Sequence, residues 1–154
     1  MNEKIKRSIE ILEKVRIRYK IHKLGGSGIT SLAVEKLTNI KLEDICKTII
    51  LTDGNGNFVG GFLPANIDVN LEKVKKIFNF NEVRLARAKE LKEVLGLAPG
   101  EICPLLLKIP IIFDPLSLKK EIIHMGSGDV HYDLEVNPND ILKLLNAKIE
   151  DISE

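Results

Sequence analysis

The residue whose type and position most suggest chemistry is Lys47. It stands inside an apolar run, residues 45–51, that is typical of a buried strand. Burying a lysine among isoleucines costs free energy unless the ammonium group finds an acceptor. Lys47 therefore points either to solvent, through the alternation of side chains along a strand, or into a polar cleft where it could bind an anion. The pattern alone does not separate these two interpretations.

Two glycine-containing segments could bring a ligand close to the main chain. Residues 100–104, Gly-Glu-Ile-Cys-Pro, place a glycine and a proline around three residues, which fixes the backbone of a loop. Residues 126–131, Gly-Ser-Gly-Asp-Val-His, form a glycine-rich bend that offers polar side chains. Each segment is also typical of an ordinary connection or hairpin turn. A third glycine-rich segment, residues 25–28, lacks the lysine and the spacing of a phosphate-binding loop, so we interpret it as a turn.

The usual signatures of nucleophilic, nucleotide-dependent or zinc-dependent catalysis are missing. There is no Gly-x-Ser-x-Gly elbow, no Walker loop and no His-Glu-x-x-His motif. The two cysteines, Cys46 and Cys103, are isolated, and the three histidines, His22, His124 and His131, have no metal-type spacing. We therefore predict no cofactor and no metal site, and we expect both thiols to be reduced and buried.

Size and composition indicate one soluble domain over residues 1–154. A chain of 154 residues with 44% hydrophobic and 29% charged residues can bury a sufficient core without a disulfide. The longest apolar runs are far shorter than the roughly 20 residues that span a bilayer, and the N-terminus does not resemble a signal peptide. We therefore expect no membrane association and a location in the cytoplasm.

Positive charge is concentrated near the N-terminus. Residues 1–48 carry 11 Lys and Arg against 6 Asp and Glu, whereas the rest of the chain carries 12 against 16. The basic side chains of the first part could meet nucleic-acid phosphates, or they could be the solvated face of an exposed helix. They are Lys4, Lys6, Arg7, Lys14, Arg16, Arg18, Lys20 and Lys23.

Periodicity and turn residues predict a mixture of helices and short strands. Helices are expected over residues 3–19, 30–37, 71–78, 91–95 and 138–145. Strands are expected over residues 20–24, 45–51, 57–63, 82–85, 105–107, 111–113, 121–125, 132–136 and 147–152. Regular strand–helix alternation is absent, so we predict an α/β domain of the α+β type, with one mixed, mostly antiparallel sheet flanked by helices.

Taken in order, these features resemble the YbaK/EbsC family of free-standing aminoacyl-tRNA deacylases, which are related to the editing insertion of prolyl-tRNA synthetase. The resemblance runs from about residue 22 to residue 152. The matching stretches are residues 45–51, 61–65, 83–86, 100–104, 111–114, 125–128 and 140–145.

The resemblance implies trans-editing, which is hydrolysis of the ester bond of a mischarged small aminoacyl-tRNA such as Ala- or Cys-tRNA(Pro). It implies Lys47 and Gly100 as the main site residues, and neither a metal nor a covalent nucleophile. It further implies that the substrate, including the 3′-terminal adenosine of the tRNA, meets Ile102, Cys103, Pro104, Gly126, Ser127, Gly128 and His131. Prolyl-tRNA synthetase is a conceivable partner on the same grounds.

Two other functions stay open on the sequence. A non-catalytic module that binds tRNA or a synthetase would rely on the basic N-terminal segment. A small-nucleotide binder would use the same pocket without hydrolysis. Family members often have a small residue or serine where Cys103 stands, so the amino acid removed and the roles of both cysteines stay open as well.

Overall fold

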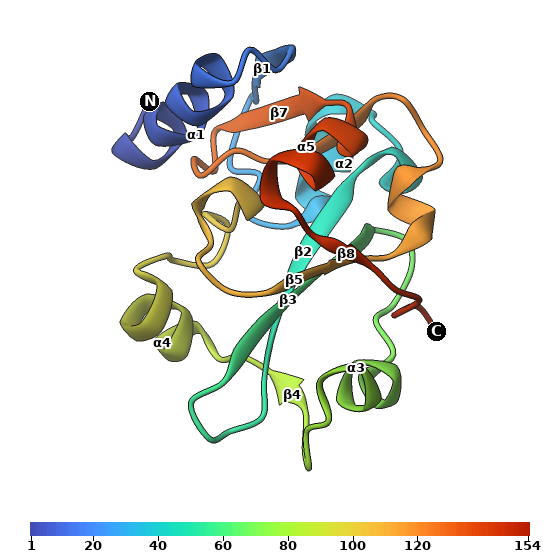
Figure 1. Ribbon diagram of the computed structural model, residues 1–154. Coiled ribbons are helices and arrows are strands. Elements are labelled where there is room, and N and C mark those ends of the chain that lie inside the picture. The colour runs from blue at the N-terminus through green and yellow to red at the C-terminus, as the bar shows by residue number, and fades with distance from the viewer.

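The computed structural model describes residues 1–154 and contains two β-sheets surrounded by short helices (Figure 1). The larger sheet has the strand order β4 (Arg84–Leu85), β2 (Cys46–Thr52), β3 (Phe58–Pro64), β5 (Ile111–Phe113) and β8 (Lys148–Ile149). The smaller sheet has the order β1 (Tyr19–Lys23), β7 (Tyr132–Val136) and β6 (Ile123–Gly126). Only the pairs β3–β5 and β5–β8 are parallel.

The helices are short and lie around the two sheets. They are α1 (Glu3–Lys14), α2 (Ser31–Thr38), α3 (Leu71–Phe78), α4 (Ala88–Glu90), which continues as a π-helical turn over Leu91–Leu95, and α5 (Pro138–Leu145). Three 3-10 turns occupy Leu42–Asp44, Pro104–Leu106 and Pro115–Leu118. None of these helices has the length and hydrophobicity needed to cross a membrane.

Helix boundaries follow the capping residues where those are present. The Thr30 hydroxyl accepts the N–H of Ala33 at the start of α2, as expected from the sequence. Helix α1 is shorter than the predicted 3–19. It ends at Lys14 because Arg16 turns into the left-handed region (φ 58°) and the Ile17 N–H bonds back to the helix.

The predicted strand at residues 105–107 is wrong. Pro104 opens a 3-10 turn there, in which the Leu106 N–H bonds to the Cys103 carbonyl oxygen. A proline at the first position of a turn supplies the required φ and needs no donor. The 3-10 turn, and not strand pairing, therefore places the leucines of this run in the core.

The predicted type of strand pairing is confirmed, because it is mixed and mostly antiparallel. The strands nevertheless form two sheets and not one. A single parallel bridge between Ile45 and His124 connects the N-terminal end of β2 to β6. This junction leaves an opening beside β2, where the candidate site lies.

The main hydrophobic core fills the space between the two sheets. Phe62 and Phe113 are fully buried there, with their ring centroids 4.4 Å apart. Met125 and Leu134 reach the same core from the smaller sheet. A second, smaller cluster lies under α3 on the opposite face of the larger sheet and includes Leu51. Strand β2 therefore has a buried face on each side, which explains its nearly continuous apolar sequence.

Candidate active site

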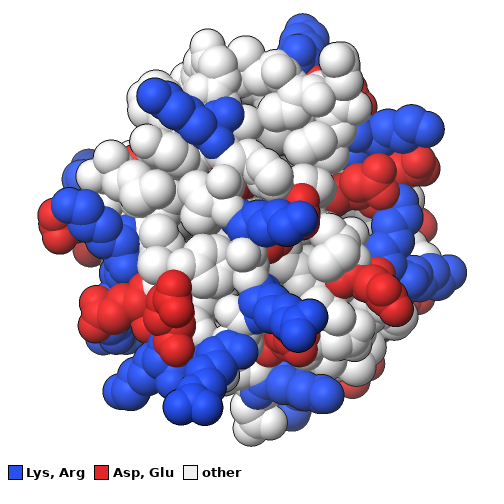
Figure 2. Space-filling model, turned by 90° about the horizontal axis from the view of Figure 1, so that it is seen from above, with Lys and Arg blue, Asp and Glu red and all other residues white.

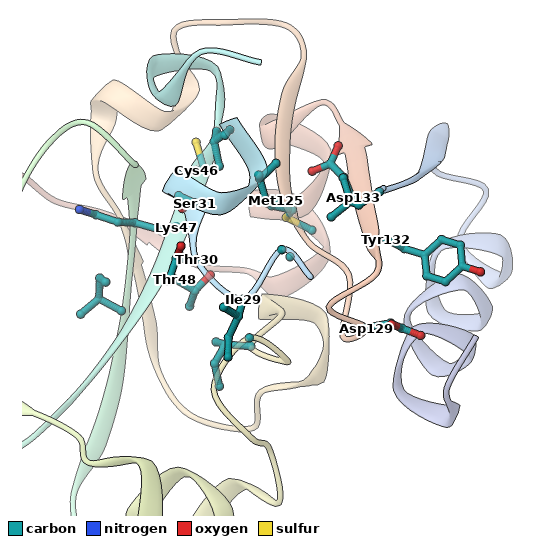
Figure 3. A pocket seen from close by; sticks show the side chains of 18 residues that line it. Ile29, Thr30, Ser31, Cys46, Lys47, Thr48, Met125, Asp129, Tyr132 and Asp133 are labelled. Carbon is teal, nitrogen blue, oxygen red and sulfur yellow. The ribbon is translucent and has the colours of Figure 1, made fainter. Parts of the chain in front are cut away.

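A pocket of about 350 Å³ opens beside the N-terminal half of β2 (Figure 3). Its walls come from four parts of the chain: the turn before α2, strand β2, the loop that begins at Gly100, and the end of β6 with the start of β7. About half of the lining residues are hydrophobic. A small, half-apolar cleft with a few polar groups is the usual form of a small-molecule site.

The three glycine segments of the sequence meet at this pocket. Gly100 has φ +88°, and a Cβ atom there would lie 2.7 Å from a Val130 methyl group and 2.9 Å from Ile29 Cγ1. The Gly28 N–H donates to the Val130 carbonyl oxygen at 2.6 Å. Both the conformation and the close packing exclude larger residues at Gly100. The turn before α2, the 100–104 loop and the 126–131 bend are therefore packed into one wall.

Gly126 brings two of these main-chain segments still closer together. A Cβ atom at this position would lie 2.4 Å from the carbonyl oxygen of Ile102. No side chain can be accommodated at that distance without a shift of the backbone. Two main-chain segments are thus packed closely together in this part of the wall, where main-chain N–H and C=O groups can meet a ligand.

Strand β2 contributes a free edge to the pocket. The Ile45 carbonyl oxygen accepts the N–H of Ala65 on one side of β2, and the Ile50 carbonyl oxygen accepts the N–H of Ala86 on the other side. Because main-chain groups alternate along a strand, those of Thr48 point to the same side as those of Ile50. Strand β4 covers this edge only at Leu51–Thr52. The main-chain groups of Thr48 therefore face the pocket and are placed to bind a ligand.

Lys47 is partly buried at the rim of this pocket, and not in solvent. Its Nζ lies 3.4 Å from the Ala65 carbonyl oxygen, across the end of β3. In Figure 3 its ammonium group points away from Ile29 and Met125. Burial lowers the pKa of Lys47, and nearby Asp68 opposes that shift. The lysine is thus held by one neutral acceptor, which leaves most of its hydrogen-bonding capacity for an anionic ligand.

Of the nine predicted site residues, four line the pocket: Lys47, Gly100, Ile102 and Gly126. The other five do not. Cys103 is fully buried, with its Sγ 3.6 Å from the Ser8 hydroxyl, and Pro104 is buried beside it. Their side chains belong to the core because the 3-10 turn carries them inward.

The three remaining predictions lie in the 126–131 bend. The buried Ser127 hydroxyl bonds to main-chain groups within the bend, including the carbonyl oxygen of Tyr132 at 2.8 Å. Gly128 packs against the main chain of Lys4 in α1. His131 is exposed and lies outside the pocket lining. These residues build the bend and do not form the wall of the pocket.

The sequence reasoning did not select several residues that line the pocket. They are Thr30, Ser31, Thr48, Tyr132 and two aspartates. One of these, Asp129, accepts the main-chain N–H groups of Asn2 and His131. Burial would raise the pKa of Asp129, but these two hydrogen bonds outweigh burial and hold the pKa below its ordinary value. The sequence marks Thr30 as the residue that caps the following helix, but a helix cap does not by itself indicate a ligand site.

Cys46 also lines the pocket, but it is not a nucleophile. Burial raises the pKa of its thiol to about 12, although nearby Lys120 acts in the opposite direction. A thiol with this pKa carries almost no thiolate at neutral pH. Both cysteines are free and buried, as expected.

Four of the eight basic side chains named for the N-terminal segment, Lys4, Lys6, Arg7 and Lys20, have an acidic partner. Figure 2 shows Lys and Arg side chains spread among acidic ones around a large uncharged area. Several of the basic groups have acidic partners, including Lys4 with Glu101 at 2.8 Å and Arg7 with Glu10 at 3.2 Å. Paired charges of this kind favour the interpretation of a solvated helix face over a dedicated phosphate-binding patch.

All the pocket-lining residues except Leu24 lie within the part of the chain that matches a known family. The model of the aminoacyl-tRNA editing domain covers residues 28–144. The chain belongs to this aminoacyl-tRNA editing family. The match includes β2, the 100–104 loop and the 126–131 bend, and it confirms the resemblance found in the sequence.

Two curated relatives of this editing domain differ in length. A proline–tRNA ligase of Sulfurihydrogenibium sp. is 30% identical over 102 residues, which are 64% of this chain but only 18% of the ligase. A protein of Enterococcus faecalis described as a candidate Cys-tRNA(Pro)/Cys-tRNA(Cys) deacylase, EbsC, is 21% identical over 95% of this chain and 92% of its own length. The chain thus spans a small part of the first relative and nearly all of the second.

Solved structures show the same fold over the whole chain. A hypothetical protein of known crystal structure superposes with a TM-score of 0.88, at 24% identity, over 96% of this chain and 99% of the other. A candidate trans-editing enzyme for prolyl-tRNA synthetase gives a TM-score of 0.84 at 19% identity, over 100% and 99% of the two chains. At these identities the likeness establishes the architecture of the editing fold.

Proposed function

We propose that this protein is a trans-acting aminoacyl-tRNA deacylase that hydrolyses the ester bond of a mischarged tRNA carrying a small aminoacyl group, of the Ala- or Cys-tRNA(Pro) kind. The observation that carries the proposal is the pocket itself, which is lined by Gly100 and the free edge of β2 and has Lys47 at its rim. Membership of the editing family and the similarity to EbsC support it.

The size of the pocket favours a small part of the substrate. At about 350 Å³ it lies near the lower end of ligand sites, which are typically about 300–1,000 Å³. Such a volume suits the 3′-terminal adenosine or a small aminoacyl group, with the rest of the tRNA outside. Discrimination against larger side chains then follows from the fixed main-chain wall, because Gly100 and Gly126 leave the wall no room to yield.

The geometry suits hydrolysis of an activated ester by a positioned water molecule. Attack on the ester carbonyl places negative charge on its oxygen, which must be stabilised by fixed donors. The main-chain N–H of Thr48 is such a donor at the free edge of β2. The Glu101 N–H is not available, because it already bonds to the Ala98 carbonyl oxygen. Lys47 supplies a cation for a phosphate of the tRNA end.

The protein groups that line the pocket are poorly placed to act as a general base. The Cys46 thiol stays protonated because of its raised pKa. Asp129 is occupied by two main-chain N–H groups, and Asp133 by His124. We therefore assign proton transfer to the substrate, through the vicinal hydroxyl of its terminal ribose.

The proposal treats residues 1–154 as one editing domain that acts in the cytoplasm on free aminoacyl-tRNA. Prolyl-tRNA synthetase is its proposed partner, because the chain resembles a segment of a proline–tRNA ligase. A separate protein with this domain would then act on tRNA that the synthetase has mischarged and released.

The test is a deacylation assay with a panel of mischarged tRNAs. The wild-type protein should hydrolyse small aminoacyl esters on tRNA(Pro), and Lys47→Ala should reduce kcat/KM by about 100-fold, as expected when a substrate-positioning group is lost. Lys89→Ala is the matched control, since Lys89 is a highly exposed lysine on α4, and its rate should equal that of the wild type.

Equal rates for wild type and Lys47→Ala would remove Lys47 from the mechanism. Salt-sensitive binding of uncharged tRNA together with intact aminoacyl esters across the whole panel would instead indicate a non-catalytic tRNA-binding module. Copurification of a nucleotide with a protein that shows no hydrolysis would indicate a small-nucleotide binder.

A further inference from the structure

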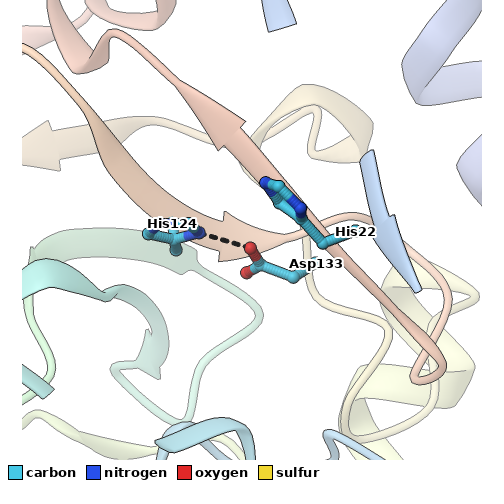
Figure 4. Close-up of side chains that lie close together, drawn as sticks. All are labelled: His22, His124 and Asp133. Atoms are coloured by element: carbon cyan, nitrogen blue, oxygen red, sulfur yellow. Dashed lines mark hydrogen bonds and ion pairs between the residues drawn. The ribbon is translucent and has the colours of Figure 1, made fainter. Parts of the chain in front are cut away.

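One face of the three-stranded sheet carries four residues that can ligate a metal. His22 lies on β1, Asp133 and Glu135 lie on β7, and His124 lies on β6. The register pairs His22 with Asp133 and His124 with Glu135, so all four side chains leave the same face of the sheet. Figure 4 shows His124 bonded to the carboxylate of Asp133, with the His22 imidazole nearby. We call these four residues the histidine cluster.

The ligand atoms of this cluster are already close together. One nitrogen of His22, one nitrogen of His124 and one oxygen of Asp133 all lie within 4.8 Å of one another. His124 Nδ1 is hydrogen-bonded to Asp133. On the other side, His22 Nε2 lies 3.0 Å from Glu135 Oε1, and His124 Nε2 lies 3.9 Å from the same oxygen. His22, His124 and Asp133 thus converge on one small volume, and Glu135 lies beside the two imidazoles.

The surroundings of the histidine cluster favour a cation. The side chains of Asp133 and His124 are only 3% and 13% exposed, which limits screening by water. Two carboxylates face two imidazoles, and the lysine that approaches them, Lys20, is itself 73% exposed and 3.9 Å from Glu135. The His22 side chain is 43% exposed, which leaves a route for an ion from solvent.

The carboxylates of the cluster also lack the partners that structural carboxylates have elsewhere in this chain. Asp129 accepts two main-chain N–H groups, and the buried Asp114 accepts the N–H groups of Leu116 and Ile152. Asp133 and Glu135, by contrast, are bonded through their side chains to imidazoles. Their side chains fix no turn or helix end, so the pairing with histidine is what requires explanation.

We propose that the histidine cluster binds one Zn²⁺ ion through His22, His124 and Asp133, with Glu135 next to the fourth position. Imidazole and carboxylate are both ordinary zinc ligands, at about 2.0–2.2 Å. Ligand atoms of a tetrahedral zinc site lie about 3.3–3.5 Å apart at these bond lengths. The three ligand atoms are within 4.8 Å now, so small side-chain rotations complete the site. The ion links all three strands of the smaller sheet.

The zinc site adjoins the pocket without being part of its proposed chemistry. Asp133 lines the pocket and also holds His124, so a bound ion would stiffen the strand that forms one wall. The inference goes beyond the deacylase proposal and does not depend on it. Loss of zinc binding with full deacylation, or the reverse, separates the two.

The test is calorimetric titration of chelator-treated protein with Zn²⁺. We expect one ion per chain, and His22→Ala should weaken binding at least about 10-fold, the smaller effect expected even for an indirect partner of a metal. His22 is the safest variant, because its exposed position makes misfolding an unlikely cause of the loss. Asp133→Asn should weaken binding as well. The matched control is His131→Ala, which removes the one histidine outside the cluster.

Titration with Co²⁺ provides a second readout. A site made of nitrogen and oxygen ligands gives visible d–d absorption without the thiolate charge-transfer band that Cys46 or Cys103 would add. Absence of Zn²⁺ binding at micromolar concentration would overturn the proposal. Equal loss in His22→Ala and His131→Ala, or a strong thiolate band, would overturn it too.

Discussion

The pocket and the histidine cluster are neighbours, but they are built from different materials. One part of the pocket wall depends on main-chain segments that pack closely at Gly100 and Gly126, which no larger residue can replace. The histidine cluster consists of side chains that the cross-strand register brings together. The comparison shows that one fold can form a binding site either by excluding side chains or by aligning them.

Charged groups also play different parts in the two regions. Around the pocket, Asp129 and Glu101 hold the chain in place by accepting main-chain N–H groups. In the histidine cluster the carboxylates are bonded to imidazoles. Charge therefore stabilises loops in the first region and pairs side chains across strands in the second.

The largest expected effect is that of Gly100→Ala, which attacks the main-chain wall. A Cβ atom would clash with Val130 and Ile29, and φ is +88°. We expect the free energy of unfolding to fall by about 1–2 kcal/mol because of the backbone conformation, and by about 1–3 kcal/mol more because of overpacking. Displacement of the loop by about 1 Å should lower the kcat/KM of deacylation about 100-fold. Urea unfolding and the deacylation assay measure the two effects.

Gly54→Ala is the control for that variant. Gly54 has φ +79° in the β2–β3 turn, but nothing lies within 4 Å of its would-be Cβ. Gly54→Ala should lower the free energy of unfolding only by the backbone-conformation cost, about 1–2 kcal/mol, and should leave the deacylation rate unchanged. If Gly100→Ala also abolished zinc binding in folded protein, the two regions would not be independent and the comparison would fail.

A smaller effect is expected for Glu101→Gln, which tests whether charge in the pocket region stabilises the loop. Glu101 accepts hydrogen bonds from Lys4 Nζ (2.8 Å) and the Ala98 N–H (2.7 Å). Burial would raise the pKa of Glu101, but these bonds outweigh burial and hold the pKa below its ordinary value of about 4.5. We expect the free energy of unfolding of the variant to be about 1 kcal/mol lower at neutral pH, and we expect the variant to retain zinc binding.

The pH dependence of this effect has a definite sign. Because the folded pKa is the lower one, the unfolded chain takes up the proton first as the pH falls, so the stabilisation is present above about pH 4.5 and is lost below it. The difference in unfolding free energy between wild type and Glu101→Gln should therefore shrink as the pH falls below 4.5. A difference that grows on acidification would contradict the assignment. Glu93→Gln is the control at an exposed position, since the Glu93 side chain is 62% exposed.

The smallest effect concerns the reactivity of the two thiols. Cys46 lines the pocket, whereas Cys103 lies in the core. Burial raises the pKa of Cys46 to about 12 and that of Cys103 to about 11, where the Ser8 hydroxyl acts in the opposite direction. Neither thiol should react measurably with a thiol-specific reagent at neutral pH until urea unfolds the protein, when both should react. Rapid reaction of Cys46 alone in folded protein would show that the pocket opens more widely than its walls indicate.

Local features of the sequence predicted local structure well. Thr30, Asn70 and Asn137 cap the three helices expected to follow them, because a side-chain oxygen beside an unpaired main-chain N–H acts over a few residues only. The predictions that failed involved competition between structures. Residues 105–107 had the composition of a strand, but Pro104 set a turn and the core accepted the leucines from there.

The site was predicted in part, for the same reason. Lys47 stood out because a lysine inside an apolar strand is unusual. Gly100 was implied by the family resemblance, because a glycine–proline loop is by itself typical of an ordinary connection. Cys103 and Ser127 did not reach the pocket, since the direction of a side chain within a bend depends on what packs against it. Thr48 was missed because its contribution is a main-chain edge, which the identity of a residue does not reveal.

The sequence by itself determined most of the types of element and their caps and turns. These depend on backbone sterics and on hydrogen bonds between near neighbours. Only the tertiary structure decided that β1 and β6 lie on either side of β7, and hence that His22 and His124 face the same carboxylates from positions about a hundred residues apart. That proximity comes from strand pairing, whose energy is spread over the whole sheet and is not recorded in the spacing of any motif.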